Sequence, residues 1–202
     1  MSTPSAPALI LASTSRYRRE LLARLRWPFE VVSPEVDETA HAGEAPAALA
    51  QRLALYKARA VAARHPHAVV IGSDQVADLH GASLGKPGDH ERAVAQLRQQ
   101  SGQRVVFHTA VAVVLAATGF ERCELASVAV QFRDLSDADI ETYLRLEAPY
   151  DCAGSAKCET LGITLLESID SDDPTALIGL PLIRTARLLR ETGIDPLHQG
   201  DA

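Results

Sequence analysis

The sequence predicts an α/β protein with a mixed, twisted sheet and flanking helices. Apolar segments of strand length alternate with amphipathic segments of helical length along the 202 residues. Two long strand-like segments, 105–115 and 124–132, follow each other directly, with a turn around Thr118 and Gly119. Strands joined by a turn pair antiparallel, so we expect the sheet to contain both strand orientations.

The N-terminal half alternates short apolar runs with helical patterns. The expected elements are a strand at 9–12, a helix at 17–26, a strand at 29–32, a helix at 46–64 and a strand at 68–72. Pro28 and Pro66 mark the expected ends of the two helices, because proline cannot continue a helix. The run 68–72 is apolar throughout, which is typical of a strand buried on both faces.

The C-terminal half has a similar alternation around the two long strands. The further expected elements are a helix at 90–99, a helix at 134–146, a strand at 162–167 and a helix at 181–191. Ser136 is the expected N-cap of the second of these helices, with Asp139 completing a capping box.

Length and composition fit a single domain over 1–202, with residues 1–7 as a flexible tail. No apolar run approaches the roughly 18 residues that a membrane span requires, and the small-residue start does not resemble a secretory signal. The three cysteines are odd in number and indicate free thiols. We therefore expect a cytoplasmic protein without a membrane partner.

The charge balance argues against a nucleic-acid partner. The chain has 20 Lys and Arg against 26 Asp and Glu, a formal charge of −6, and only 4% aromatic residues. Binding a long strand requires a broad basic surface and stacking side chains. Local positive charge in an acidic chain instead favours a small polyanion bound at one site.

Such a local charge follows the first expected strand. The small residues 13–15 precede the basic residues Arg16, Arg18 and Arg19, at the start of the expected helix. Free backbone N–H groups, the helix dipole and guanidinium donors together make a phosphate-binding design. The alternative is a solvated face of the helix, which is disfavoured because arginine in a first turn opposes the dipole.

Carboxylates form a second candidate group. Asp74 follows the apolar strand 68–72, where open α/β sheets place ligands, and can accept a proton from water or bind a metal ion. The alternative is a turn or N-cap aspartate. Glu35, Asp37 and Glu38 lie in a loop after the second strand, and with Asp74 they could share a divalent ion. Alone, such a run is more often a solvated surface.

Two lysines are candidate phosphate ligands. Lys86 lies between Gly85 and Pro87, in a stiff turn that fixes where its side chain begins. Lys57 lies on a helix, and by itself would more often be a surface lysine. The sequence contains neither a P-loop nor a G-x-G-x-x-G motif, and no histidine pair has metal-ligand spacing.

Together these segments resemble the Maf family of nucleoside triphosphate pyrophosphatases. The matching segments are Leu-Ala-Ser-Thr-Ser-x-x-Arg at 11–18, Pro-Glu-Val-Asp-Glu at 34–38, Lys57, Gly-Ser-Asp-Gln at 72–75, Gly-Lys-Pro at 85–87 and Gly-Leu-Pro at 179–181. The resemblance implies an elongated, two-lobed α/β fold shared with the inosine triphosphate pyrophosphatases, with the site in a cleft between the lobes. It also implies hydrolysis between the α- and β-phosphates of a nucleotide.

The resemblance also implies roles for individual residues. Asp74 matches the family's catalytic aspartate, the base for the attacking water, and Glu35 matches an acidic residue near the metal. With Asp74 it would hold a divalent cation, Mg, Mn or Co. The residues that match the triphosphate-holding groups are Ser13, Arg18, Lys57 and Lys86.

Three positions resemble the branch of the family that acts on 7-methylguanosine triphosphate. Tyr17 stands where that branch has an aromatic residue, which would attract the cationic methylated base. Gln75 follows the catalytic aspartate, and Glu159 could accept hydrogen bonds from guanine. Arg16 departs from the branch, which has proline there.

Two alternatives stay open. One is a pyrophosphatase for UTP, dTTP or a broader set of nucleotides. The other is a non-catalytic nucleotide sensor that regulates septum formation, with which the family is associated. A homodimer is expected only from the frequency of such assemblies.

Overall fold

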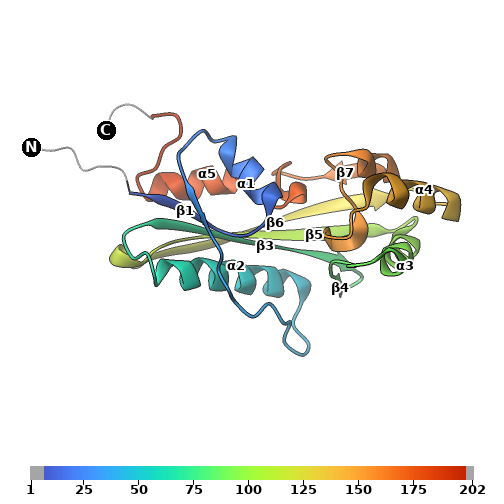
Figure 1. Ribbon diagram of the computed structural model, residues 1–202, viewed down its shortest axis with the longest axis horizontal. Helices are drawn as coiled ribbons and strands as arrows, with labels where there is room; N and C mark the ends of the chain where they lie inside the picture. The colour runs from blue at the N-terminus through green and yellow to red at the C-terminus, as the bar shows by residue number, and fades with distance from the viewer. Residues whose placement is uncertain (1–6, 199–202) are drawn as a thin grey trace, which may run out of the picture.

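The computed structural model describes residues 7–198 as an elongated α/β protein built on one mixed sheet (Figure 1). The strands are β1 (Leu9–Ala12), β2 (Glu30–Val32), β3 (Val69–Leu79), β4 (Ala82–Leu84), β5 (Arg104–Leu115), β6 (Phe120–Phe132) and β7 (Leu166–Asp170). The α-helices are α1 (Arg16–Ala23), α2 (Pro46–Ala62), α3 (His90–Gln100), α4 (Asp137–Glu147) and α5 (Leu182–Glu191). The flexible tail expected at residues 1–7 falls on residues 1–6, outside the described part, and on Pro7.

The sheet has the order β2-β1-β3-β5-β6-β7, and β4 pairs with β3 off this path. Strand β1 is parallel to both β2 and β3, whereas every other pair is antiparallel. The expectation of a mixed sheet is therefore confirmed. No helix of the described residues is long and apolar enough to cross a membrane.

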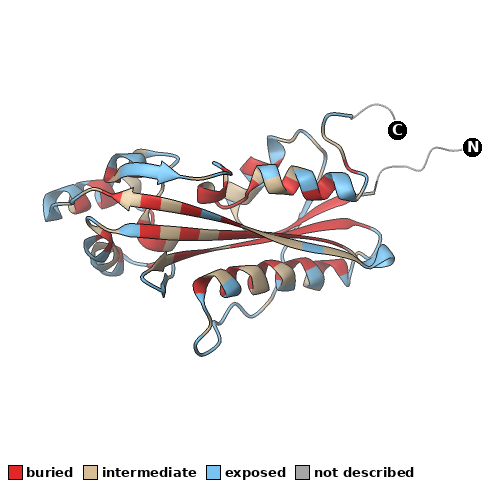
Figure 2. Ribbon diagram, turned by 180° about the vertical axis from the view of Figure 1, so that it is seen from behind, coloured by how far each residue is buried: buried red, intermediate tan, exposed pale blue. Residues whose placement is uncertain are grey.

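Different helices cover the two ends of the long strands. At one end, α2 packs on one face of the sheet, and α1 and α5 pack on the other (Figure 1). At the other end, a separate core gathers around α3, α4 and the C-terminal parts of β3 and β6. Figure 2 shows that α2 buries the side that faces the sheet and exposes its outer side.

Strand β3 differs most from its expected bounds. We expected it to end at residue 72, but it continues through Asp74 to Leu79. Asp74 therefore lies inside a strand, and its expected place beyond a strand end was wrong. The polar residues 73–75 belong to the strand because β5 pairs with them continuously, from Val70 to Asp78.

Smaller differences occur near the turns and the C-terminus. Strand β4 was not expected, and the expected strand at 162–167 is instead a 3₁₀ helix, η3 (Leu161–Leu165), followed by β7. Further 3₁₀ turns are η1 (Ala116–Thr118), η2 (Ala153–Ser155) and η4 (Ala176–Ile178). The capping box of Ser136 and Asp139 on α4 is confirmed.

An opening in the sheet lies along one edge of β3. Strand β1 pairs with residues 69–72 of this edge, and β4 pairs with residues 77–79. Among the described strands, none pairs with residues 73–76 on this edge, although β5 pairs with their other edge. Strand β1 lies between β2 and β3, with α1 and α2 on opposite faces, so its carboxyl end is a topological switch point.

Gly72 brings α2 against the sheet beside this opening. A Cβ at this position would overlap the carbonyl oxygen of Ala54 and lie 2.6 Å from the amide nitrogen of Ala58. Only glycine permits such a close approach of two backbones. The approach places Lys57, the neighbour of Ala58, over the polar part of β3.

Candidate functional site

The loop from β1 to α1 supplies the first wall of the site. Ser13 is buried, and its Oγ accepts a hydrogen bond of 3.1 Å from the amide of Ser15. Ser15 is the N-cap of α1, and its Oγ accepts from the amide of Arg18 at 3.4 Å. The start of α1 thus lies at the switch point of the sheet, where backbone amides and the helix dipole favour an anion.

A charge cluster of Lys57, Asp74 and Glu38 forms the second wall. The Lys57 Nζ is 2.7 Å from Asp74 Oδ1 and 2.9 Å from Glu38 Oε1. Lys57 and Asp74 are buried, whereas Glu38 is exposed. A buried lysine requires such partners, because an unpaired charge is costly to remove from water. Lys57 is therefore a buried, paired lysine and not the surface lysine that helical position alone suggests.

Arg18 adds a second cation to this cluster. Its Nε donates a 2.9 Å hydrogen bond to the carbonyl of Gly179, which also accepts from Ser73 Oγ at 3.2 Å. Burial lowers the pKa of the Arg18 guanidinium, while the charges of Asp74 and Glu38 raise it. Two cations thus face two carboxylates in one electrostatic neighbourhood, and the Gly-Leu-Pro segment anchors one of the cations.

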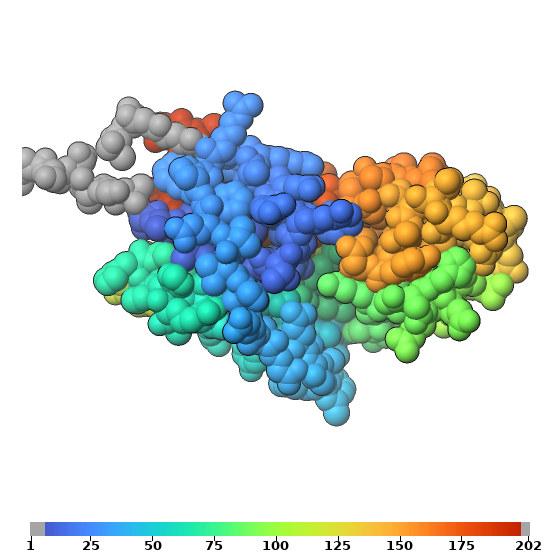
Figure 3. Space-filling model, in the orientation of Figure 1, coloured from blue at the N-terminus to red at the C-terminus, as the bar shows by residue number. Residues whose placement is uncertain are grey.

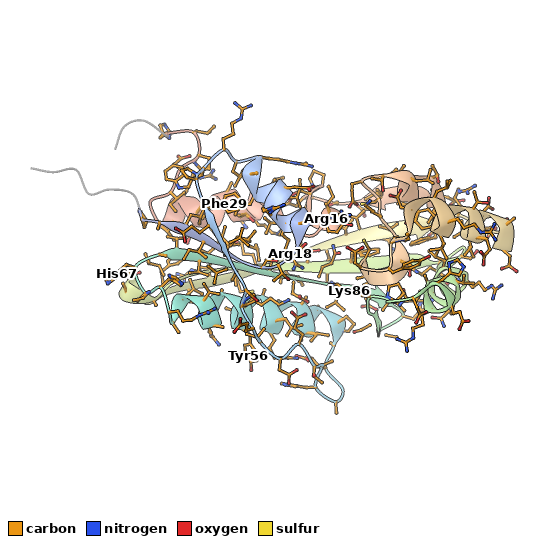
Figure 4. The ribbon with its side chains drawn as sticks, in the orientation of Figure 1. Arg16, Arg18, Phe29, Tyr56, His67 and Lys86 are labelled. Atoms are coloured by element: carbon orange, nitrogen blue, oxygen red, sulfur yellow. The ribbon has the colours of Figure 1, made fainter. Side chains whose placement is uncertain are left out.

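Within residues 7–198, Lys86 and Glu35 make no hydrogen bond or ion pair with this cluster. Lys86 is exposed, in a loop fastened by Gly85 and Gly88, and Figure 4 places it near the middle of the long axis with Arg16 and Arg18. Glu35 is also exposed, with a φ of 49°. The structure brings Glu38, three residues further along the chain, to Lys57 in place of Glu35.

Tyr17 and Glu159 both lie in the neighbourhood of Cys152. The Cys152 thiol donates to the Tyr17 hydroxyl at 3.8 Å, which joins α1 to the loop around η2. The charge of Glu159 contributes to raising the pKa of Cys152, so this carboxylate lies in the same neighbourhood. Figure 3 shows the N-terminal segment and the segment around residues 150–160 meeting near the middle of one face. The structure thus brings two of the three expected specificity residues into one region.

Gln75, the third of them, is engaged in a different way. Its Nε2 donates to the carbonyls of Ala176 and Leu177 at 2.9 and 3.0 Å, and to Thr109 Oγ1 at 3.0 Å. These bonds fix η4, the turn that leads to Gly179. Gln75 therefore supports the segment that anchors Arg18.

Three site residues escaped the sequence reasoning. Glu38 was noted only as part of an acidic run, and the Gly179 carbonyl and Cys152 were given no role. The sequence did contain a signal for Glu38, because this residue is the last of the Pro-Glu-Val-Asp-Glu motif at 34–38. Backbone carbonyls leave no trace in a sequence, and a half-buried cysteine has no distinguishing pattern.

The thiols of this protein are expected to react slowly. Burial raises the pKa of Cys123 and Cys152 to about 11 and that of Cys158 to about 12, from an ordinary value of 9.0. The thiolate is the reactive form, so at pH 8 the native protein should react about a hundredfold more slowly with a disulfide reagent than the denatured chain. The rate at which the native protein reacts with the reagent should rise continuously as the pH is raised from 8 to 10. Rapid labelling of native protein at pH 8 would contradict this.

The donor set fits a divalent cation shared with a ligand. No group of three or more His, Cys, Asp and Glu residues within 7–198 is arranged to hold a metal by itself. Asp74 and Glu38 both contact Lys57 Nζ, so the two carboxylates share one neighbourhood. Magnesium is commonly bound by one or two carboxylates, with phosphate oxygens and water completing its shell.

The fold is that of an α/β protein whose charged site lies at a switch point of its sheet. The family model described as "Maf-like protein" matches residues 8–192. The chain therefore belongs to the Maf family.

Curated relatives cover nearly the whole chain. A protein of Polaromonas sp. is 68% identical over 95% of this chain and 88% of its own length, and one of Albidiferax ferrireducens is 66% identical over 98% and 99%. A Bordetella avium protein is 62% identical over 95% and 96%. All three are named 7-methyl-GTP pyrophosphatase.

Among solved structures, the Ham1 protein of Staphylococcus aureus matches with 16% identity and a TM-score of 0.46. The match covers 63% of this chain and 72% of that one.

Proposed function

We propose that this protein hydrolyses 7-methylguanosine triphosphate to 7-methylguanosine monophosphate and pyrophosphate. The observation that carries the proposal is the identity of 62–68% to three 7-methyl-GTP pyrophosphatases over 95% or more of this chain. The charge cluster at the switch point supports it, because phosphoryl transfer requires mainly positioning and charge neutralisation.

Asp74 is the proposed general base. Its carboxylate is held by Lys57 at 2.7 Å, beside the part of the β3 edge that lies between the pairs with β1 and those with β4. It would take a proton from water as the water oxygen attacks phosphorus. The phosphoanhydride bond between the α- and β-phosphates then breaks, and the electron pair leaves with the departing phosphate oxygen.

We propose that the triphosphate of the substrate binds to the cationic side chains around Asp74. Ser13 and the start of α1 face it from one side, and Lys57 and Arg18 lie beside the base. Lys86 is exposed and free to reach a phosphate from the opposite loop. Long lysine side chains serve this purpose as mobile point charges.

A divalent cation, Mg, Mn or Co, is the proposed cofactor. Asp74 would hold it together with a carboxylate of the loop 34–38, in which Glu35 is the residue that the family resemblance indicates and Glu38 is the residue placed beside Lys57. When bound, the ion would neutralise negative charge that develops on the phosphate oxygens. Lys57 balances the two carboxylates without ligand, and its flexible stem lets the ammonium turn to a phosphate.

The methylated base is proposed to lie against Tyr17, near Glu159. A positively charged ring is attracted to an aromatic face, and a carboxylate accepts from the N1–H and amino groups of guanine. We further propose that the enzyme acts in the cytoplasm, alone or as a homodimer, the commonest soluble oligomer.

A substrate panel tests the proposal. Pyrophosphate release is measured with 7-methylguanosine triphosphate, GTP, UTP, dTTP and CTP, in magnesium, manganese, cobalt or EDTA. We expect preference for the methylated nucleotide and loss of activity in EDTA. Preference for pyrimidines would refute the assignment of the base, and activity unchanged by EDTA would refute that of the cofactor.

Exchange of two side chains should redirect the base preference. The double variant Tyr17→Arg, Glu159→Gln removes the aromatic face and the carboxylate that favour a cationic purine. We expect kcat/KM for 7-methylguanosine triphosphate to fall about tenfold or more relative to UTP, since each contact contributes on the order of 1 kcal/mol. An unchanged order of substrates in this variant would rule out both residues as determinants of specificity.

A further inference from the structure

The exposed Arg16 side chain covers the ring of Tyr17. The guanidinium carbon lies 4.7 Å from the ring centroid, and Nη2 donates a 2.8 Å hydrogen bond to the Tyr17 hydroxyl. Burial raises the pKa of that hydroxyl, so the ring is a neutral phenol. The contact is therefore a cation–π pair between adjacent residues, reinforced by a hydrogen bond.

We infer that Arg16 is a specificity-determining residue that weakens the preference of this enzyme for cationic bases over neutral ones. This inference rests on the proposed function, in which the methylated base is read by Tyr17. Arg16 would act through Tyr17, the side chain that is proposed to contact the base.

The physical reason is competition for one aromatic ring. The attraction of a cation to a ring comes from the negative potential of the ring's faces. A guanidinium over the ring, bonded to its hydroxyl, draws on that potential and adds a positive charge nearby. A methylated guanine must displace this group or share the ring with it, whereas neutral guanine loses little from the arrangement.

The effect on the triphosphate is separate. Arg16 lies in the first turn of α1, so its charge attracts the phosphates of every nucleotide alike. Removing it should raise KM for methylated and unmethylated nucleotides together. The ratio of their kcat/KM values cancels this common contribution and isolates the effect at the ring.

Arg19 provides a matched control. It is an exposed arginine on the same helix, and the ring contact of Tyr17 is made by Arg16. The variants Arg16→Ala and Arg19→Ala therefore remove the same charge from the same helix, but only the first uncovers the ring.

The test compares the ratio of kcat/KM for 7-methylguanosine triphosphate to that for GTP. Arg16→Ala should increase this ratio about two- to fivefold, the range expected for an exposed cation–π contact. Arg19→Ala should leave the ratio unchanged. In a Tyr17→Ala background, Arg16→Ala should no longer alter the ratio. An unchanged or lower ratio in Arg16→Ala, or an equal increase in Arg19→Ala, would overturn the inference.

Failure of the proposed function gives a different result. In that case the wild-type protein would hydrolyse neither nucleotide in any metal, and the ratio would be read from dissociation constants for the same two nucleotides by calorimetry. The same two- to fivefold increase in Arg16→Ala would then support the ring competition. No increase would overturn it.

Discussion

Asp74→Asn is expected to lower turnover of 7-methylguanosine triphosphate about a thousandfold, the middle of the range for loss of a general base. The amide keeps the shape of the side chain, but it cannot accept a proton at neutral pH. Nucleotide binding should persist, because the variant removes a negative charge that lies beside the proposed phosphate site. Single-turnover kinetics and calorimetry measure the two quantities separately.

Asp78→Asn is the matched control on the same strand. Asp78 lies four residues after Asp74 on β3, so the two side chains share one face of the strand. The Asp78 carboxylate accepts a 2.6 Å hydrogen bond from the Gly81 amide and lies 3.3 Å from His108 Nε2. Its replacement should leave kcat within about twofold, because none of these partners belongs to the charge cluster. If Asp74→Asn retained more than a tenth of wild-type kcat, Asp74 could not be the base. Binding without turnover in the wild-type protein itself would favour the nucleotide sensor.

Gly72→Ala is expected to cost at least about 3 kcal/mol of stability, the upper range for overpacking a core. The added methyl group overlaps the Ala54 carbonyl and approaches the Ala58 amide, and both groups belong to helix backbone that cannot rotate away. The helix must shift from the sheet or the variant must unfold. Chemical denaturation followed by circular dichroism measures the loss.

The activity of Gly72→Ala carries a second expectation. Lys57 precedes Ala58, so a displaced α2 should lengthen the 2.7 Å contact between Lys57 and Asp74 and lower kcat in the fraction that stays folded. Gly85→Ala is the stability control, since an added Cβ there meets nothing within 4 Å. It should change the free energy of unfolding by less than about 0.5 kcal/mol. Equal stability of the two alanine variants would contradict the close packing of α2.

Local patterns predicted most of the fold because they act over short distances. The capping box of Ser136 lies within four residues, and the runs of β5 and β6 are long enough to define strands without their partners. Strand β3 could not be bounded this way. Its polar residues 73–75 resemble a turn, and they are extended only because β5 lies beside them along their whole length.

The site shows a similar limit. The family resemblance pointed to Arg18, Lys57 and Asp74 as site residues, and the structure places these three charges in one neighbourhood. The choice between Glu35 and Glu38 depended on which side of a loop faces α2, and no periodicity governs a loop. Nor could any pattern indicate that the Gly179 carbonyl, 161 residues from Arg18, holds its guanidinium.

The opening along β3 has a width set by strand register. Residues 73–76 lie between the last pair with β1 and the first pair with β4, and these four residues span about 13 Å at roughly 3.3 Å per residue. The pairing between two strands can lengthen only by whole residues, so the length of the opening can change only in steps of one residue, roughly 3.3 Å. Extending β1 by one residue would narrow it by a quarter and place that residue's side chain on the face opposite to that of Ala12. Insertions should therefore be tolerated in the loops around the aperture far better than in the two short strands that bound it.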